Sequence, residues 1–172
     1  MRLDLSCSPR FHEQMENIQS ANDDVAPAPC ARPDVTASLT RGVSRLFRDL
    51  GLAPMAEFRL PNGRRADMAG LCPKGRLVIA EIKSCEADFA ADEKWEDYLG
   101  FCDAFYFAVN ADFPRDLLPD GEGLIIADGF GGAIVRDPVE RSMAAARRKA
   151  ITLRFARQAA ARTAFILEEM GK

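Results

Sequence analysis

Histidine is nearly absent from this sequence. The 172 residues contain a single histidine, His12, within a polar N-terminal stretch. A Ser-His-Asp triad, a Cys-His pair or a multi-histidine metal site all depend on imidazoles placed among other catalytic groups. Any catalysis by this chain must therefore depend on carboxylates and lysines.

Cysteine is present, but not in the patterns that disulfides or structural metals require. The five cysteines are odd in number and lack the short paired spacings of zinc ribbons and zinc fingers. This disfavours both a disulfide framework and a structural zinc site. The cysteines are Cys7, Cys30, Cys72, Cys85 and Cys102.

Long hydrophobic runs are also missing. No apolar stretch approaches the roughly 20 residues that a membrane-spanning helix needs, and the first residues lack the apolar core and cleavage site of a signal peptide. We therefore expect a cytoplasmic protein that does not bind membranes. Its hydrophobic content of 48% and charged content of 28% are ordinary for a globular protein. The net charge of −3 argues against coating nucleic acid through bulk charge, although a local basic face is compatible with it.

The chain divides into a tail and one domain. Residues 1–33 have no sustained apolar period, and residues 22–29 have the composition of a linker. We expect a flexible tail over 1–33, with a short docking helix around Phe11–Ile18 as the alternative, and a single domain over residues 34–172.

The domain is expected to begin with an amphipathic helix over Thr36–Leu50, ended by Gly51. The opposite face of this helix carries arginines that either lie in solvent or contact DNA phosphates. The apolar face is formed by Leu39, Val43, Leu46, Phe47 and Leu50, and the basic face by Arg41, Arg45 and Arg48.

Strand patterns and turn residues predict an α/β fold for the rest. Strands are expected over 56–60, 65–71 and 76–83, because Pro61-Asn62-Gly63 and residues 72–75 are turn sequences. A polar helix over 88–99, a buried strand over 104–109 and a hairpin formed by 123–128 and 132–136 should follow. From Pro138 onward, one long helix or two in succession are expected.

Three charged residues form a candidate site. Alternation along a strand places Glu81 and Lys83 on the same face. Asp67 and Glu81 are symmetric about Lys74, so a regular hairpin brings them opposite each other with Cβ atoms about 5 Å apart. Two carboxylates in that relation repel each other, and a bound cation is the economical compensation. Oxygen ligands favour Mg²⁺ or Mn²⁺, and the chemistry such a group suits is phosphodiester hydrolysis.

Asp67 followed by Glu81-Ile82-Lys83, on a core of a helix, three strands, a helix and a strand, resembles the PD-(D/E)xK nuclease superfamily. The longer pattern is similar to the MmcB-like family of bacterial DNA-repair proteins over roughly Leu39 to Phe165. This pattern comprises Gly63-Arg64-Arg65-Ala66-Asp67, Glu81-Ile82-Lys83-Ser84, Asp92-Glu93-Lys94-Trp95, Tyr98, Cys102-Asp103 and Phe105-Tyr106-Phe107-Ala108-Val109.

The resemblance implies a restriction-endonuclease-like core, metal binding by Asp67 and Glu81, and a catalytic role for Lys83. The proline of the superfamily motif is replaced by Ala66. The acid that many such nucleases carry on the first helix is also missing, since only Asp49 lies between Thr36 and Leu50.

Three further residues are candidates for accessory roles. Glu57 could supply the missing acid if a bulge at the Pro61-Asn62-Gly63 turn shifts the strand register by one. Lys94 and Tyr98, four residues apart on the expected helix, correspond to positions where related nucleases carry a Gln and a Tyr. A solvated lysine beside a packed tyrosine is the alternative.

The C-terminal segment is basic, with eight lysines and arginines against three glutamates over residues 138–172. Such a face either follows a DNA backbone or is simply solvated. The candidate DNA contacts on this segment are Arg147, Arg148, Lys149, Arg154 and Arg157.

These observations favour a Mg²⁺-dependent nuclease that acts on structured or damaged DNA, since no separate sequence-reading module is evident. The alternative is a DNA-binding scaffold of a repair complex, with repair-protein partners and little or no catalysis. A cofactor-dependent enzyme is disfavoured because no glycine-rich phosphate loop occurs. The sequence leaves the oligomeric state and the cleavage polarity open.

Overall fold

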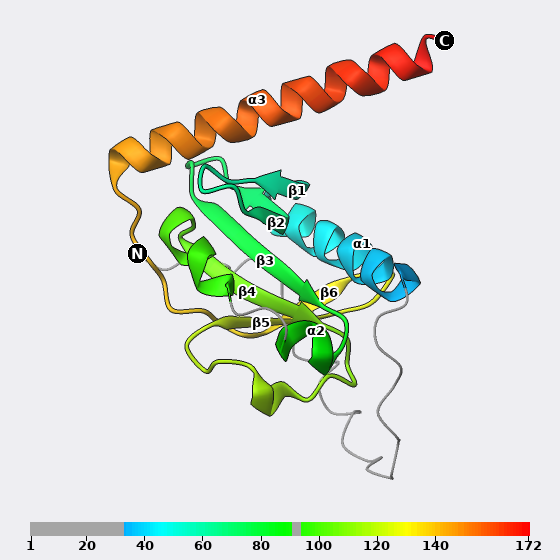
Figure 1. Ribbon diagram of the computed structural model, residues 1–172, viewed down its shortest axis with the longest axis vertical. Coiled ribbons are helices and arrows are strands. Elements are labelled where there is room, and N and C mark those ends of the chain that lie inside the picture. Colours follow the sequence, from blue (N-terminus) through cyan, green and yellow to red (C-terminus); the bar gives the residue numbers. More distant parts are fainter. Residues whose placement is uncertain (1–32, 91–93) are drawn as a thin grey trace.

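The computed structural model describes residues 33–90 and 94–172 (Figure 1). The tail and docking helix expected within residues 1–33 thus lie outside the described residues, apart from Pro33. The elements are α1 (Pro33–Asp49), β1 (Ala53–Arg59), β2 (Arg65–Leu71), β3 (Leu77–Lys83), α2 (Glu86–Ala90), the 3₁₀ helix η2 (Trp95–Phe101), β4 (Ala104–Val109), the 3₁₀ helix η3 (Arg115–Leu117), β5 (Gly123–Ala127), β6 (Gly132–Arg136) and α3 (Ala145–Met170).

The strands form one six-stranded sheet in the order β1-β2-β3-β4-β5-β6. The first three strands are antiparallel, β3, β4 and β5 are mutually parallel, and β6 returns antiparallel to β5. The mixed α/β class, the three strands after the first helix, the buried strand over 104–109 and the extra hairpin agree with the sequence predictions. All residues of β3 and β4 are buried, which explains their continuous apolar character.

Helix α1 covers one face of the sheet. Leu39, Val43 and Phe47 are each at most 1% exposed and pack on Val78, Ala80 and Ile82 of β3, as the amphipathic period predicted. The helix ends in a Schellman arrangement: Gly51 has φ +73°, and the Leu52 N–H donates to the Phe47 carbonyl over 2.8 Å.

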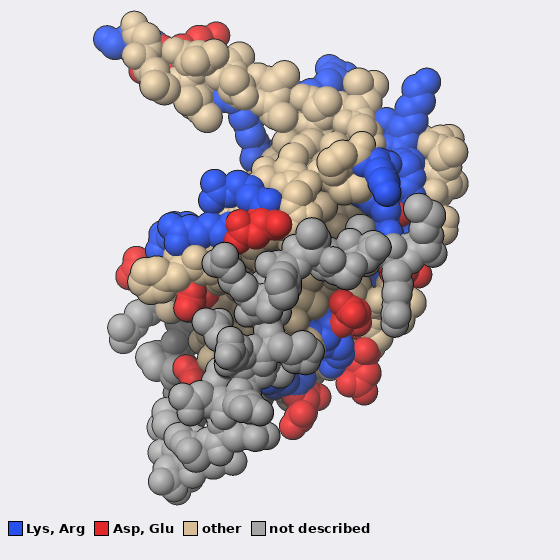
Figure 2. Space-filling view, turned by 180° about the vertical axis from the view of Figure 1, so that it is seen from behind, with Lys and Arg blue, Asp and Glu red and all other residues tan. Residues whose placement is uncertain are grey.

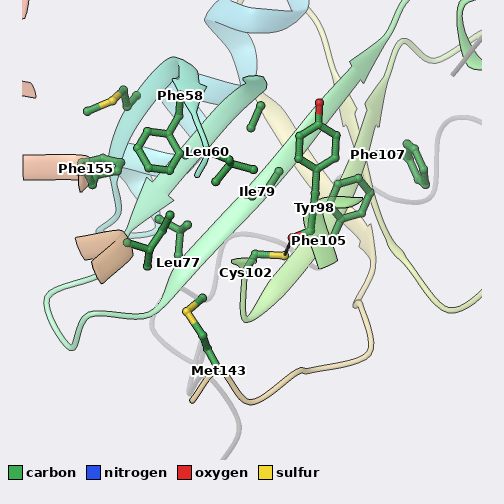
Figure 3. Packing of buried hydrophobic residues seen from close by; sticks show 14 of the residues in the cluster. Phe58, Leu60, Leu77, Ile79, Tyr98, Cys102, Phe105, Phe107, Met143 and Phe155 are labelled. Carbon is green, nitrogen blue, oxygen red and sulfur yellow. Dashed lines mark hydrogen bonds between the residues drawn. The ribbon is translucent and has the colours of Figure 1, made fainter. Parts of the chain in front are cut away.

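The other face of the sheet carries the larger core cluster (Figure 3). Leu77 and Ile79 of β3 pack there with Phe105 and Phe107 of β4, under residues from η2 and α3. The ring of Phe155 from α3 lies 5.4 Å from that of Phe58, centroid to centroid. Because odd-numbered β3 residues face this cluster, Glu81 and Lys83 belong to this side of the sheet.

The polar helix expected over residues 88–99 is not continuous. The α-helical part is α2, which begins before Asp88 and ends at Ala90, and residues from Trp95 onward form a 3₁₀ helix. The tighter winding places Trp95 and Tyr98, three residues apart, on one face, where both pack against Phe105. The 3₁₀ winding thus allows both aromatic side chains to pack onto the sheet.

The expected C-terminal helix forms as one helix, but it starts later than predicted. Residues 138–144 form neither helix nor strand. The Val139 N–H donates to the Gly121 carbonyl and the Arg141 N–H to the Asp103 carbonyl, while the Arg141 guanidinium forms two hydrogen bonds to the buried Glu122 carboxylate. These long-range bonds hold the segment against the β5 end of the sheet until α3 begins at Ala145. Within the described ranges, no helix is long and apolar enough to cross a membrane.

Candidate functional site

Asp67 and Glu81 meet where the β2–β3 ladder ends. The paired residues run from Leu71–Leu77 to Met68–Ala80, and this register counts Asp67 opposite Glu81. The hairpin symmetry about Lys74 that the sequence predicted is therefore present in the structure.

Beyond the Met68–Ala80 pair, hydrogen bonds to the two carboxylates replace the backbone-to-backbone hydrogen bonds between β2 and β3. The Asp67 N–H donates to Glu81 Oε1 over 3.1 Å, and the Ile82 N–H donates to Asp67 Oδ2 over 2.9 Å. Each acid thus accepts a backbone hydrogen bond from the opposite strand, which fixes both side chains at the strand junction. The junction is preorganised by the sheet itself, without a loop.

Burial changes the acidity of Asp67. The apolar surroundings raise the pKa of this carboxyl above its ordinary value, while the Ile82 N–H and the Lys83 ammonium act in the opposite direction. The Asp88 carboxylate adds to the rise, and Arg65 opposes it. When burial raises the pKa of a carboxyl group, its charged form is destabilised. A nearby cation would stabilise that charged form.

Glu81 and Lys83 are both buried charges, each 4% exposed. Burying an ammonium or a carboxylate costs several kcal/mol unless it is paired and hydrogen bonded. Polar end residues on an otherwise apolar strand therefore need a compensating network. The structure brings the three sequence-predicted residues, Asp67, Glu81 and Lys83, together at one point of the sheet.

Two charged residues near this point were missed by the sequence prediction. Asp88 lies in α2 and accepts hydrogen bonds at 3.3 Å from both the N–H and the hydroxyl of Ser84. Arg65 begins β2, two residues before Asp67, and its side chain is 53% exposed. The first turn of α2 directly follows β3, so the position of Asp88 could have been anticipated from the short connection alone.

Glu57 stands in the register that the accessory role required. The Pro61-Asn62-Gly63 turn is closed by the Leu60 N–H donating to the Arg64 carbonyl, and it is a three-residue turn with Gly63 at φ +85°. The flanking pairs, Ala56–Met68 and Phe58–Ala66, place Glu57 opposite Asp67 in the register. Glu57 itself has φ +52°, and its carboxylate lies 3.4 Å from the Arg65 guanidinium. It is thus oriented toward the exposed arginine.

The prediction that Lys94 and Tyr98 share one face of a helix is wrong. Lys94 is exposed at the start of η2, whereas Tyr98 is 7% exposed. Residues four apart in a 3₁₀ helix point about 120° away from each other. The Tyr98 hydroxyl donates to the Arg65 carbonyl over 3.1 Å, so Tyr98 steadies the start of β2 two residues from Asp67.

Several of the predicted DNA-contacting arginines have intramolecular partners. Arg148 forms two short hydrogen bonds to Asp103, at 2.6 and 2.7 Å, and one to the Gly75 carbonyl. Arg147 donates to the Gly100 carbonyl and lies over the Phe101 ring. Arg148 is therefore a structural residue that anchors α3, while Lys149, Arg154 and Arg157 are exposed.

The arginines of α1 line an open groove on the opposite face of the sheet from Glu81. Arg45 donates to the Gly129 and Phe130 carbonyls, at 3.1 and 3.0 Å, so it also ties α1 to the β5–β6 turn. Arg41 and Arg48 are exposed. The groove is lined by Thr40, Arg41, Ser44, Arg45, Arg48, Ala56 and Met68.

Asp67 and Glu81 form a small donor set for a metal. Over residues 33–90 and 94–172, no three histidine, cysteine, aspartate or glutamate side chains gather closely enough to hold an ion. Mg²⁺ often binds proteins through only one or two carboxylates and keeps water as its other ligands. Two oxygen ligands that meet on adjacent strands are compatible with that hard cation, and they do not suit zinc.

Comparison with known proteins places the chain in a family. The chain is 42% identical to the SPO1766 protein of unknown function from Silicibacter pomeroyi, and the two structures match with a TM-score of 0.76 over 83% of this chain and 96% of the other. No curated protein matches the chain. Residues 23–169 match the family described as DNA repair protein MmcB-like. Because this match covers most of the sequence, the chain belongs to the MmcB-like family of DNA repair proteins.

Proposed function

We propose that this protein is a metal-dependent nuclease that hydrolyses phosphodiester bonds in structured or damaged DNA during repair. The observation that carries the proposal is the meeting of Asp67 and Glu81 across the β2–β3 junction with Lys83 buried on the same strand as Glu81. The element order of a helix, three strands, a helical segment and a strand supports a PD-(D/E)xK core. Membership of a DNA-repair family supports DNA as the substrate.

Asp67 and Glu81 are the residues that would hold Mg²⁺ or Mn²⁺. Such an ion polarises a phosphoryl oxygen and lowers the pKa of a bound water. The backbone N–H groups of Asp67 and Ile82 fix the two carboxylates in place, so their positions need no rearrangement when substrate arrives. Lys83 would orient the attacking water or offset negative charge on the phosphate. Tyr98 would hold the β2 end that carries Asp67.

DNA contact would come from exposed cationic side chains rather than from Arg148, which is bound to the buried Asp103 carboxylate. Arg65 is the basic residue nearest to Asp67 along β2, and its guanidinium is half-exposed. Arg154 and Arg157 of α3 are exposed, and Arg41 and Arg48 line the groove along α1. Exposed guanidinium groups are suited to phosphate contacts that carry no sequence information.

The test is cleavage of labelled single-stranded, duplex, flap and junction DNA with Mg²⁺ or Mn²⁺. We expect the wild-type chain to cut at least one substrate and Lys83→Met to lose at least about a hundredfold in rate, which is typical for removal of a charge-stabilising group. Methionine keeps the buried volume of the side chain. Lys74→Met, at the exposed β2–β3 turn, is the matched control and should retain full activity.

Metal binding is tested separately from cutting. We expect Mn²⁺ to raise the melting temperature of the wild-type chain, because an ion bound only by the folded state stabilises it. Asp67→Asn should abolish this rise while leaving DNA binding intact. A melting temperature that ignores Mn²⁺ in the wild type would contradict the proposed roles of Asp67 and Glu81.

The small donor set favours a second candidate, a DNA-binding scaffold of a repair complex. Helix α1 carries only Asp34 and Asp49 as acids and packs on the sheet face opposite to Glu81. If no DNA is cut and the wild type and Lys83→Met bind DNA equally, this scaffold role is the one to retain.

A further inference from the structure

The outer half of α3 carries an apolar face that the body of this chain does not cover. The first half of the helix packs on the sheet through Ile151 and Phe155, whereas its C-terminal end projects beyond the body (Figures 1 and 2). Large apolar side chains on this helix remain open to solvent: Leu153 is 58% exposed, Leu167 63% and Met170 79%. Exposed large apolar groups arranged along one helix mark a surface for association.

These residues belong to a stripe with coiled-coil spacing. Positions 153, 156, 160, 163, 167 and 170 are separated alternately by three and four residues, and all are exposed. They are Leu153, Ala156, Ala160, Thr163, Leu167 and Met170. A repeat of three and four keeps side chains on one seam of a helix.

The polar member of the stripe does not prevent its burial. The Thr163 hydroxyl donates to the Ala159 carbonyl of its own helix over 3.0 Å, so covering it leaves no unsatisfied donor. The central alanines allow two helix backbones to approach closely, while Leu153 and Met170 supply bulk at either end. Leu153 and the buried Phe155 lie two residues apart and thus on nearly opposite sides of the helix. A second helix can therefore reach the stripe without meeting the body.

The charge distribution along α3 indicates which helix fits there. The first two-thirds of the helix contain only basic charges, and the end contains Glu168 and Glu169. A parallel pairing with another α3 would bring like charges together. An antiparallel pairing places Leu153 beside Met170 and brings Glu168 and Glu169 of one copy to the same level along the helix pair as Arg154 and Arg157 of the other. These charges lie outside the stripe, so they favour one orientation through long-range attraction rather than through ion pairs in contact.

We infer that this protein forms a homodimer through antiparallel pairing of the α3 stripes of two copies. The stripe extends over about 26 Å of helix at 1.5 Å per residue. A helix pair of this length buries on the order of 1,000 Å², which is the lower end of specific interfaces and corresponds to a reversible dimer. The two bodies then lie on opposite sides of the helix pair, so each copy keeps its own Asp67 and Glu81.

The test is sedimentation velocity of the full chain without nucleic acid, over a wide range of protein concentration. We expect a monomer–dimer equilibrium and, for Leu167→Asp, at least about tenfold weaker association, equal to 1.4 kcal/mol. Phe165→Asp is the matched control: Phe165 is also 63% exposed and lies two positions away, off the stripe, so its association should be unchanged. A wild-type chain that remains monomeric at every concentration, or equal weakening by both variants, would overturn the proposal.

The orientation is tested by charge reversal. In an antiparallel pair, reversing both glutamates to arginine places four positive charges near each other at each end of the pair and should weaken the homodimer. Mixing that chain with one in which Arg154 and Arg157 are changed to glutamate should restore association to the wild-type level. Unchanged association of the doubly reversed chain alone would overturn the antiparallel arrangement. All four positions are exposed, so each variant is expected to fold, and circular dichroism is the check on this.

Discussion

Asp103 is a buried acid whose charge the fold uses. Its side chain is 3% exposed and accepts two hydrogen bonds from Arg148 and one from the Leu77 N–H. Burial alone would raise the pKa of this carboxyl, but the guanidinium and the backbone N–H together outweigh burial, so the pKa lies below its ordinary value of 3.8. The pair joins the start of α3 to the first residues of β3.

The lowered pKa predicts how stability depends on pH. Between the ordinary value and the folded-state value, the unfolded chain binds more protons than the folded chain, so the contribution of Asp103 is full at neutral pH and is lost as pH falls through the folded-state pKa. We expect Asp103→Asn to cost about 3 kcal/mol at pH 7, because it leaves a partly buried Arg148 charge without its partner.

Urea unfolding at neutral and acidic pH measures this difference. The gap between Asp103→Asn and the wild type should stay constant down to about pH 5 and shrink at lower pH. Asp97→Asn removes the exposed partner of Arg64 and should cost less than about 1 kcal/mol. A gap that does not change with pH would show that Asp103 acts through packing alone.

At the scale of elements, periodicity in the sequence was enough to predict those helices and strands that depend only on their own local pattern. Helix α1, the strands of the first hairpins and β4 follow from alternation, apolar runs and turn residues. The Asp67–Glu81 meeting could also be predicted, because hairpin symmetry depends only on the turn. By contrast, the Arg141–Glu122 pair, which holds the non-helical residues 138–144 against the sheet, joins residues 19 positions apart. The aromatic packing of η2 depends on Phe105, which lies in β4. Local patterns do not contain such contacts.

Gly42 illustrates how a neighbouring element reverses a local preference. Alanine is favoured over glycine in a helix interior by about 1 kcal/mol. A Cβ at position 42, however, would lie 2.1 Å from the Asp128 carbonyl oxygen and 2.4 Å from that of Gly131, both backbone atoms of the β5–β6 turn. We therefore expect Gly42→Ala to lower the free energy of unfolding by at least about 2 kcal/mol, typical of overpacking in a tight site. Thermal unfolding of Gly42→Ala and of Ser44→Ala, two residues further along α1, checks this. A Gly42→Ala variant that is more stable than the wild type would refute the close approach.

For the whole molecule, α3 also closes one edge of the sheet. Strand β1 is the first strand in the sheet order and would otherwise present unpaired backbone groups that template aggregation. The Gln158 amide both accepts from the Arg59 N–H, at 3.1 Å, and donates to the Arg59 carbonyl, at 2.8 Å. One turn later, the Arg162 guanidinium donates to the carbonyls of Ala56 and Glu57. Two side chains of the helix thus take the place of a seventh strand.

Replacing both side chains separates edge protection from core packing. We expect Gln158→Ala with Arg162→Ala to lose about 1–2 kcal/mol of stability, since the lost hydrogen bonds are partly exposed, but to aggregate markedly faster on mild heating. Phe155→Ala should show the opposite balance of effects. It removes a buried ring and costs about 3–5 kcal/mol of stability, but it leaves the Gln158 hydrogen bonds to the edge strand, so aggregation should increase less for the stability that is lost. Light scattering and thermal unfolding on the same samples distinguish the two effects. If the double variant aggregates no faster than wild type at equal unfolded fraction, the edge must be protected by the twist of β1 at Glu57, where φ is +52°, rather than by α3.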